Sequence, residues 1–498
     1  MPIRYIERSN MMKRIAKGLI AVMCILLLII FVKALLFSSK QVSVKGPENM
    51  IADKSLVARH LAGALACRTI SSEDESRLDR GAFLKLHRYL ERTYPRAHRV
   101  MKKEVVSGLS LLYTWKGTDP SLKPLLFMSH LDVVPAEKSD GEGWTHPPFS
   151  GIIADGYIWG RGALDVKNGL IGIMEAMEMM AAKGISPART IYLAFGHDEE
   201  VGGDRGNRKI AALLKERGIR LACVIDEGGY IVGGMIPGVA APVALIGIAE
   251  KGYLSLELSA QGAGGHSSMP PKNTNVGKVA RAVYRLEKHP FPGTLDGPAR
   301  DMFEFVGPEM PFTYRILFGN TWLFKPLIGM VLSASPSTAA MIRTTTAATM
   351  FNAGTMENVL AQKAVATINF RILPGETAGS VIARVRRVID DDDVIITELK
   401  HSQDPSPVSS VDAREFTALQ RAISAIFPRA IVAPYLVVGA TDSRHYSDVA
   451  DQVYRFLPGR LGKEDMKKIH GTNERISVDN MAEIPLFIIA FISELDRR

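Results

Sequence analysis

The sequence predicts an α/β fold with a smaller α+β domain inserted into it. Short runs of β-branched and aromatic residues alternate with helical segments, and several of these runs end in acidic residues or histidine. Between residues 249 and 374 the pattern changes, because two runs alternate apolar and polar residues as half-exposed strands do. The length of 498 residues is enough for two or three domains.

The composition is that of a folded globular protein, with 47% hydrophobic and 23% charged residues. The net charge of +9 is spread along the chain, and no basic stripe is interleaved with aromatic residues, so we do not expect a nucleic-acid partner. The three cysteines, Cys24, Cys67 and Cys223, make no disulfide framework. One bond between Cys67 and Cys223 stays open, so the cysteines do not decide the redox compartment.

An apolar segment at residues 18–37, interrupted only by Lys33, has nearly the length that spans a bilayer. Five basic residues precede it, so the positive-inside rule predicts a cytoplasmic tail at 1–17, an anchor at 18–37, a linker at 38–47 and the rest of the chain on the periplasmic, luminal or extracellular side. A cleaved signal peptide is the main alternative, but residues 37–40 offer no small-x-small cleavage site. A buried core helix rarely follows so many basic residues at an N-terminus.

After helical segments between residues 47 and 99, strands are expected at 110–115 and 124–128. The second strand runs into His130 and Asp132, which point to the same side because side chains alternate along a strand. A metal-bound imidazole needs its second ring nitrogen fixed, and a nearby carboxylate does this. Taken alone, the two residues could equally be a hydrogen-bonded structural pair.

Asp165 lies in a glycine-rich loop, residues 160–169, between a short strand and a buried helix. The glycines allow a tight turn beside whatever Asp165 holds. A phosphate-binding loop is the alternative, but the carboxylate of Asp165 would repel an anion. Metal binding therefore fits the loop better.

Three consecutive acids, Asp198 to Glu200, follow the strand-like run at 190–194. Such dense negative charge is costly to desolvate without a counter-ion, so a divalent cation is the natural partner, although a solvated acidic loop is the common alternative. The strand at 221–225 also ends in acids, Asp226 and Glu227. The carboxyl ends of strands in an open α/β sheet form its ligand-binding edge, where we expect these groups to meet.

The inserted domain has strands at 252–258 and 365–372 and a helix near 275–288. Its glycine-rich motif at 262–270 contains a histidine that, taken alone, is typical of a turn. An apolar stretch around 322–332 could line an acyl pocket or lie against lipid, but we expect it to be part of this domain's core.

Five motifs in order along the chain resemble the co-catalytic zinc carboxypeptidase and aminoacylase family, the acetylornithine deacetylase/succinyl-diaminopimelate desuccinylase superfamily. The motifs are Ser129-His-Leu-Asp-Val-Val134, Gly160-Arg-Gly-Ala-Leu-Asp-Val-Lys167, Gly196-His-Asp-Glu-Glu-Val-Gly-Gly203, Gly264-Gly-His-Ser-Ser-Met-Pro270 and His470-Gly-Thr-Asn-Glu474. Within the family the chain is most similar to the carboxypeptidase S group of Gly-Xaa carboxypeptidases and N-acyl-amino-acid hydrolases. Arg343-Thr-Thr-Thr346, Phe351-Asn-Ala-Gly354 and the predicted anchor support this subgroup.

The resemblance implies two zinc ions per chain, for which cobalt or manganese could substitute, held by five side chains. Asp165 would bridge the two ions. His130 and Asp226 would complete the ligands of one ion, and Glu200 and His470 those of the other.

The resemblance also implies roles for five further residues. Asp132 would orient His130, and Glu199 would be the general base. His266 would stabilise the oxyanion from the inserted lid, and in dimeric relatives this histidine comes from the partner subunit. Asn358 and Arg371 would hold the substrate, and Arg371 suits a bidentate grip on a free α-carboxylate.

The fold implied is a zinc-exopeptidase-like, three-layer α/β/α catalytic domain, residues 48–248 and 375–498, with the lid at 249–374 offering a surface for a homodimer. The function implied is hydrolysis of an amide bond that releases a C-terminal amino acid from a peptide or an N-acyl amino acid. Synthesis of fatty-acyl amino acids would use the same transition state. A non-catalytic binding protein would show a gap in the ligand set, and a nucleotide-dependent oxidoreductase would need a glycine fingerprint; the sequence shows neither.

Overall fold

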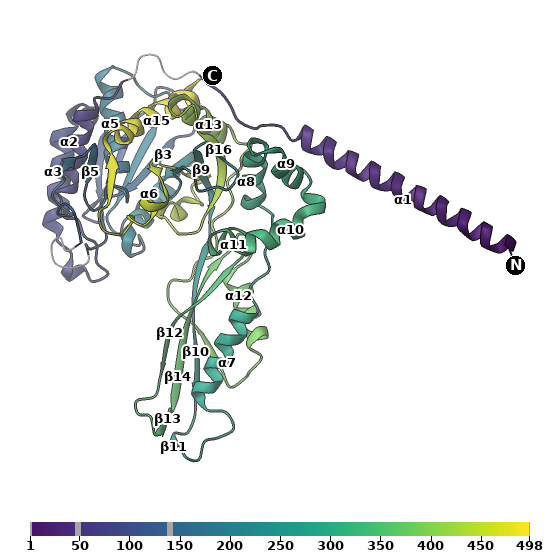
Figure 1. The fold of residues 1–498 in the computed structure, drawn as a ribbon. Coiled ribbons are helices and arrows are strands. Elements are labelled where there is room, and N and C mark those ends of the chain that lie inside the picture. The colour runs from purple at the N-terminus through teal and green to yellow at the C-terminus, as the bar shows by residue number, and fades with distance from the viewer. Residues whose placement is uncertain (1, 45–50, 137–142, 498) are drawn as a thin grey trace.

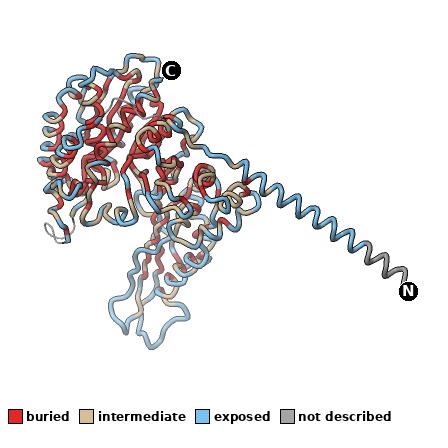
Figure 2. Tube along the Cα trace, turned by 45° about the horizontal axis from the view of Figure 1, so that its top comes forward, coloured by how far each residue is buried: buried red, intermediate tan, exposed pale blue. Residues whose placement is uncertain are grey.

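The computed structural model describes residues 2–44, 51–136 and 143–497. Figure 1 shows three parts: a large domain built on a twisted sheet, a narrower inserted domain that extends away from it, and a long N-terminal helix that projects from the body. Buried residues concentrate in the large domain, whereas the projecting helix and the far end of the inserted domain are exposed (Figure 2).

A ten-stranded mixed sheet forms the centre of the large domain, with the order β1-β2-β6-β3-β7-β17-β9-β8-β18 and β16 paired to β9. Strands β3, β6 and β7 run parallel to one another, so their carboxyl ends share one edge. The strands are β1 (Lys102–Val106), β2 (Ser110–Trp115), β3 (Leu125–His130), β6 (Ile191–Gly196), β7 (Leu221–Asp226), β8 (Ile231–Val232), β9 (Val243–Glu250), β16 (Ile431–Val437), β17 (Ala450–Arg455) and β18 (Arg460–Leu461).

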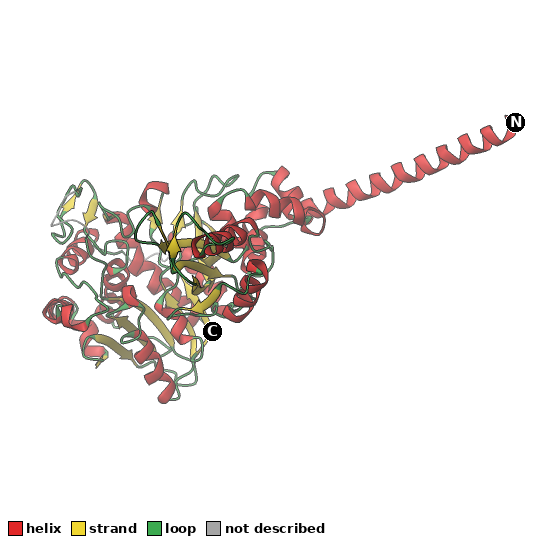
Figure 3. Cartoon of the chain, turned by 90° about the horizontal axis from the view of Figure 1, so that it is seen from below, coloured by secondary structure: helices red, strands yellow, loops and turns green. Residues whose placement is uncertain are grey.

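Helices cover both faces of this sheet (Figure 3). Side chains alternate along β3, so Leu125 and Phe127 join the core on one face, and Leu126 and Met128 join the core on the other. One face carries α2 (Lys54–Leu65), α3 (Arg80–Thr93), α4 (Pro95–Val100), α5 (Lys167–Ala182), α13 (Arg414–Ile426) and α15 (Val478–Asp496). The other carries α6 (Asn207–Glu216) and the 3₁₀ helix η5 (Asp442–Tyr446). The predicted three-layer α/β/α architecture is confirmed.

Short elements complete the large domain beside the main sheet. Strands β4, β5 and β19 form a three-stranded antiparallel sheet that brings the segment around residue 475 next to the loop after β5. These elements are β4 (Ile153–Ala154), β5 (Tyr157–Trp159), β19 (Arg475–Ser477), α14 (Lys463–Met466), and the 3₁₀ helices η1 (Glu75–Arg77) and η3 (Glu199–Val201).

The inserted domain is an antiparallel four-stranded sheet in the order β12-β14-β10-β15, with two helices packed on it around a separate core. Its elements are β10 (Gly252–Gln261), α7 (Asn275–Lys288), β12 (Thr345–Ala353), β14 (Lys363–Ile372), α12 (Ala378–Ile389) and β15 (Ile395–Glu398). Because α12 and β15 belong to it, the expected end at 374 is too early. A small two-stranded sheet, β11 (Gly265–His266) with β13 (Val359–Leu360), lies at its far end (Figure 1).

A run of helices joins the inserted domain to the large one: α8 (Pro298–Val306), the 3₁₀ helix η4 (Gly307–Glu309), α9 (Phe312–Phe318), α10 (Thr321–Ser333) and α11 (Pro336–Ile342). Helix α8 packs on β16 and contributes Met302, Phe305 and Val306 to the core of the large domain. In α10 only Ile328 is buried. The expectation that the stretch at 322–332 forms domain core therefore holds for one face of this helix only.

Helix α1 (Pro2–Leu36) projects from the body beside α9 and α10 (Figure 1). Its segment Met11–Leu36 contains an 18-residue window with a mean hydropathy of 3.1 and is long and apolar enough to cross a membrane, a test that a signal sequence also passes. The expected linker at 38–47 is described as far as residue 44, and its last residues lie outside the described ranges. Gln41 ties it to β16: the side-chain amide donates to the carbonyl of Val432 at 2.9 Å and accepts from its N–H at 2.8 Å.

Candidate active site

Polar side chains gather at the carboxyl edge of the main sheet. His130 is the last residue of β3, Glu199 and Glu200 open η3 just after β6, and Glu227 follows β7. Two connecting segments supply the remaining groups, Asp165 from the loop between β5 and α5 and His470 from the segment between α14 and β19. The parallel order of β3, β6 and β7 is what places residues so far apart in sequence at one edge.

These side chains form two groups with the spacing of metal ligands. In the first group, Nε2 of His130 lies 3.0 Å from Oδ1 of Asp165 and 3.3 Å from Oε1 of Glu227. In the second, Nε2 of His470 lies 2.9 Å from Oδ2 of Asp165 and 3.2 Å from Oε2 of Glu200. Within each group the candidate ligand atoms all lie within 4.8 Å of one another. Asp165 offers one oxygen to each group, so the two sites share a carboxylate.

The sequence-based assignment of Asp226 to the first group has to be corrected to Glu227. Asp226 belongs to neither group, and its Oδ2 accepts a hydrogen bond from the backbone N–H of Ser443 at 3.0 Å. Consecutive residues at a strand end point in opposite directions, so only one of these two acids can face His130. The sequence offers both acids side by side and does not show where the strand ends.

Asp132 holds the imidazole of His130 from the side away from the two groups. Nδ1 of His130 lies 2.9 Å from the backbone carbonyl oxygen of Asp132 and 3.4 Å from its carboxylate. The same carboxylate accepts hydrogen bonds from the backbone N–H groups of Glu199, at 3.2 Å, and Glu200, at 3.1 Å. With its proton on Nδ1, His130 would present the lone pair of Nε2 to a cation bound between it, Asp165 and Glu227.

Glu199 lies beside the first group without belonging to either. Its Oε2 is 4.0 Å from Nε2 of His130. Burial raises the pKa of the Glu199 carboxyl well above its usual value, although the nearby His130 opposes this. The group is therefore a buried carboxylate that holds a proton readily and stands next to the candidate metal sites.

The protein's own side chains do not balance the negative charge of the buried carboxyl groups at the site. Burial raises the pKa of Glu227 to about 8 and raises that of Glu200, while hydrogen bonds to Asp165 and Glu200 raise the pKa of His470 to about 10. Oε1 of Glu200 is buried and has no hydrogen-bond partner among the residues that the structure describes. Bound cations would remove this cost, and imidazole and carboxylate donors without cysteine suit zinc, cobalt or manganese. The residues present fit such ions.

A buried ion pair that sequence reasoning missed supports the Asp165 loop. The carboxylate of Glu474 accepts a hydrogen bond from Nη1 of Arg161 at 2.8 Å and from the backbone N–H groups of Leu164, at 2.7 Å, and Asp165, at 3.1 Å. Nη2 of Arg161 donates to the carbonyl of His470 at 3.1 Å. Glu474 and Arg161 thus fix Asp165 relative to His470. Both lie in motifs noted in the sequence, but only their contacts in the fold indicate this role.

The structure brings Arg371 of the inserted domain near the site. Arg371 and Tyr253 line a cavity of about 1110 Å³ together with Glu200, and the guanidinium stacks on the Tyr253 ring at 4.9 Å. Six further Arg, Lys and His residues share this lining: Arg205, Arg208, Lys400, His401, Arg444 and His445.

His266 and Asn358 are not brought to the site within this chain. Both are exposed at the far end of the inserted domain, where the backbone N–H of Ser267 donates to the carbonyl of Asn358 at 3.2 Å (Figure 1). Nδ1 of His266 lies 2.7 Å from Oγ of Ser268.

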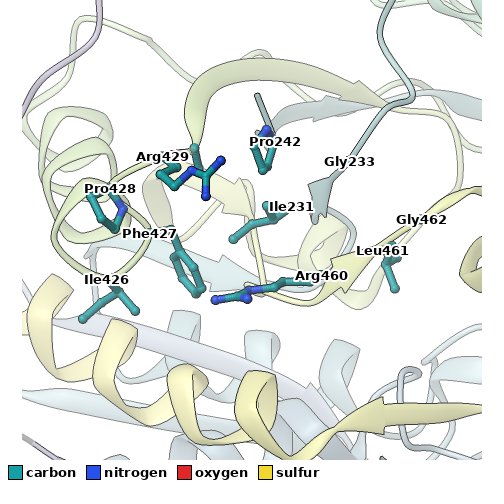
Figure 4. Close-up of a pocket in the computed structure, with 11 residues that line it drawn as sticks. Ile231, Gly233, Pro242, Ile426, Phe427, Pro428, Arg429, Arg460, Leu461 and Gly462 are labelled. Atoms are coloured by element: carbon teal, nitrogen blue, oxygen red, sulfur yellow. The ribbon is translucent and has the colours of Figure 1, made fainter. Parts of the chain in front are cut away.

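A second cavity, of about 500 Å³, contains none of the candidate residues (Figure 4). It is lined mainly by apolar side chains, among them Ile231 and Phe427, and the guanidinium of Arg460 lies 5.3 Å from the Phe427 ring centroid. Arg460 is also paired with Glu483. This cavity is separate from the candidate active site.

Comparison with known proteins supports the resemblance of the motifs. The model of Peptidase family M20/M25/M40 matches residues 126–494. A probable carboxypeptidase S-like 2 of Dictyostelium discoideum is 40% identical, covering 98% of this chain and 95% of its own length. The N-fatty-acyl-amino acid synthase/hydrolase PM20D1 of Mus musculus is 41% identical, covering 89% of this chain and 88% of its own.

Two solved structures share the fold at low sequence identity. Human carnosine dipeptidase 1 has a TM-score of 0.62 at 15% identity and covers 89% of this chain and 97% of its own. The M20 family metallo-carboxypeptidase Sso-CP2 from Sulfolobus solfataricus has a TM-score of 0.63 at 18% identity and covers 88% of this chain and 99% of its own. With the family match over most of its length and relatives of this identity, the chain belongs to peptidase family M20/M25/M40.

Proposed function

We propose that the protein is a metal-dependent amidohydrolase that releases a C-terminal amino acid from a peptide or an N-acyl amino acid. The observation that carries this proposal is the pair of ligand groups sharing Asp165, with Glu199 beside them in neither group. Relatives named as carboxypeptidase S-like proteins and as N-fatty-acyl-amino acid synthase/hydrolases support the substrate class.

Two zinc ions, or cobalt or manganese in their place, would be held by His130, Asp165 and Glu227 and by Asp165, Glu200 and His470. When bound, such a pair of ions polarises an amide carbonyl and lowers the pKa of a water molecule.

Glu199 would take a proton from the attacking water and deliver it to the leaving amine. Its position beside the ligand groups and its raised pKa both suit a group that accepts and then donates a proton. Asp132 would keep His130 oriented. By accepting hydrogen bonds from the backbone N–H groups of Glu199 and Glu200, it would also fix the proposed base and the proposed ligand relative to His130.

Arg371 would bind the free α-carboxylate of the substrate, because a guanidinium grips a carboxylate with two parallel hydrogen bonds. Its place on the wall of the cavity that also contains Glu200 supports this assignment. A carboxylate held there would limit the enzyme to terminal bonds, so we infer an exopeptidase or acyl-amino-acid hydrolase.

His266 would stabilise the oxyanion of the substrate carbonyl, and Asn358 would help to hold the substrate. Both are exposed at the tip of the inserted domain, away from their own site (Figure 1). A homodimer through the inserted domain, in which each chain offers its tip to the other, would bring them to a substrate.

Helix α1 would be an uncleaved signal anchor, with the N-terminus in the cytoplasm and the large domain on the opposite side of the membrane. Its apolar length and the basic residues Lys13, Arg14 and Lys17 before the apolar run support this orientation.

The test of the proposed activity is metal analysis combined with hydrolysis of an N-acyl amino acid and an N-blocked dipeptide, before and after chelation. We expect two zinc ions per chain and release of the C-terminal amino acid, lost on chelation and restored by zinc. Bound metal without turnover of either substrate would favour a binding protein. Net condensation of fatty acids with amino acids under the same conditions would favour the synthase direction, which one of the relatives' names includes.

A further inference from the structure

We propose that helices α9 and α10 dock on the extracytoplasmic leaflet of the bilayer that α1 crosses, so that the enzyme is seated on a lipid surface and not only tethered to it. This inference rests on the proposed signal anchor. The partner that α9 and α10 would contact is a phospholipid bilayer.

One face of this helix pair is apolar and exposed. The face consists of Phe312, Trp322, Leu323, Leu327, Met330 and Val331. Met330 is 71% exposed, Val331 64% and Trp322 53%, whereas Ile328 on the opposite side of α10 is buried in a small core. An exposed apolar patch of this kind marks an interaction surface.

The face is continuous with the anchor. Nδ2 of Asn320 donates to the carbonyl of Ile30 at 2.9 Å, and Nη2 of Arg315 donates to the carbonyl of Phe37 at 3.2 Å. The rings of Phe31 and Phe312 meet edge to face at 5.6 Å. Helices α9 and α10 therefore contact the last two turns of α1 directly, and in Figure 1 they lie where α1 leaves the body.

These contacts fix the depth of α9 and α10 in a bilayer. At about 1.5 Å per residue, the segment from Gly18 to Phe37, which is helical as far as Leu36, is about 30 Å long, and this matches the hydrocarbon thickness of a bilayer. Ile30 then lies about 10 Å inside the outer boundary. Groups that touch Ile30 and Phe31 must lie at that depth as well, and interfacial helices bury their apolar face by about 5–10 Å.

The polar groups at the junction suit this depth. Arg315 also donates to the carbonyl of Ala34 at 3.2 Å, so carbonyls in the last turn of α1 find protein partners where a bilayer would offer none. Nζ of Lys33 lies 5.6 Å from the centroid of the Trp322 ring. Tryptophan and lysine are the residues that anchor protein segments at the membrane interface.

Trp322 is a native probe for this proposal. Of the four tryptophans in the sequence, Trp115, Trp144 and Trp159 are buried in the large domain, and α1 contains none. The full chain would be reconstituted in phosphatidylcholine vesicles with bromine atoms on the acyl chains, either near the headgroup or near the bilayer centre. The emission of Trp322 is obtained by subtracting the emission of W322F from that of the native chain.

We expect bromolipids to quench the Trp322 emission by at least half, and more strongly with bromine near the headgroup. The matched control is W322F/Y284W, which moves the tryptophan to Tyr284 on α7, a residue 59% exposed and outside the apolar face. Its emission should not be quenched.

Flotation of the vesicles separates this proposal from the anchor. A chain that floats with the vesicles but shows no quenching of Trp322 would overturn the docking of α9 and α10 and leave the anchor in place. A chain that does not float would overturn the anchor and the docking with it. Protection of Trp322 from aqueous iodide without bromolipid quenching, in a chain that sediments as a dimer, would assign the face to a second copy and overturn the proposal.

Discussion

Glu199 and Glu200 are neighbours in the sequence, but their carboxylates have different surroundings. Oε2 of Glu200 lies 3.2 Å from Nε2 of His470 in a ligand group, whereas Glu199 belongs to neither group and its Oε2 lies 4.0 Å from Nε2 of His130. The turn after β6 therefore gives adjacent carboxylates different surroundings, which suits the proposed roles of ligand for Glu200 and general base for Glu199.

For E199Q we expect kcat to fall by about 10²- to 10⁴-fold, because the amide cannot accept the proton of the attacking water. The metal content should stay unchanged, since Glu199 belongs to neither candidate ligand group. The measurement is turnover of an N-acyl amino acid together with metal analysis, and E200Q is the control that should lose metal. Full activity of E199Q would remove Glu199 from the mechanism.

The choice between Asp226 and Glu227 gives a second test at the residue scale. E227A should reduce the zinc content from about two ions per chain to about one, because it removes a ligand of the His130 group. D226N should retain both ions, since Asp226 accepts a hydrogen bond from Ser443 instead. Metal analysis after dialysis checks this, and the reverse pattern would restore Asp226 as the ligand.

Several site residues can be predicted from the sequence, because His130 and the Glu199–Glu200 pair lie at the ends of strand-like runs and Asp165 lies in a glycine-rich loop after another. The sequence does not show which of the adjacent acids Asp226 and Glu227 faces the site, since this depends on the last residue of β7. The contribution of Glu474 cannot be predicted either, because it arises from contacts across more than 300 residues. Neither the choice between the two acids nor the contribution of Glu474 is visible in the pattern of residue types along the chain.

At the scale of elements, Glu474 couples the segment around β19 to the loop before α5. For E474Q we expect metal affinity to fall by about 10- to 100-fold, as for other groups that orient ligands. The isosteric amide keeps the shape of the side chain but gives up the charge that pairs with Arg161. Competition with a chelator measures the affinity, and an unchanged value would leave Glu474 with a purely structural role.

Helix α3 has a pH-sensitive contact through His87. Its Nε2 lies 2.9 Å from the carbonyl of Leu109, and burial lowers the pKa of His87 to about 4 from the ordinary 6.5. The folded state thus keeps His87 neutral, while the unfolded chain takes up a proton below pH 6.5. The stability that depends on a neutral His87 is fully present above pH 6.5 and is lost as the pH falls towards 4, by up to about 3 kcal/mol.

Urea unfolding of the native protein and H87Q at pH 7 and pH 4.5 measures this loss. The glutamine amide can still donate to Leu109 but does not titrate. We expect the native protein to lose more stability than H87Q between the two pH values. An equal loss in both would show that His87 does not contribute to the acid sensitivity.

At the scale of the whole molecule, the inserted domain carries His266 away from the site of its own chain. Mixing E199Q with H266A tests whether the histidine acts from a partner. Random dimers would restore about one quarter of the native activity, because half of them are mixed and each mixed dimer has one complete site. Coexpression and an activity assay measure this, with size-exclusion chromatography as the control for dimers. No recovery in a confirmed dimer would place His266 within its own chain.

The domain order is predictable from the sequence, since the change from buried to alternating strands marks the start of the inserted domain near β10. The end of the inserted domain cannot be predicted, because the sequence of α12 and the short β15 looks like a continuation of the large domain. Only the pairing of β15 with β10 shows where they belong. The two-sided character of α10 is hidden for a similar reason: an apolar run does not show which of its faces is covered.

The hydrogen bonds of Gln41 have a practical consequence for producing the enzyme without its anchor. Through one side chain, Gln41 occupies both the donor and the acceptor of Val432 on β16, a strand whose pairing in the sheet is with β9. Free edges of strands recruit other chains and lead to aggregation. A shortened protein should therefore begin before Gln41, so that this amide continues to shield the edge of the sheet.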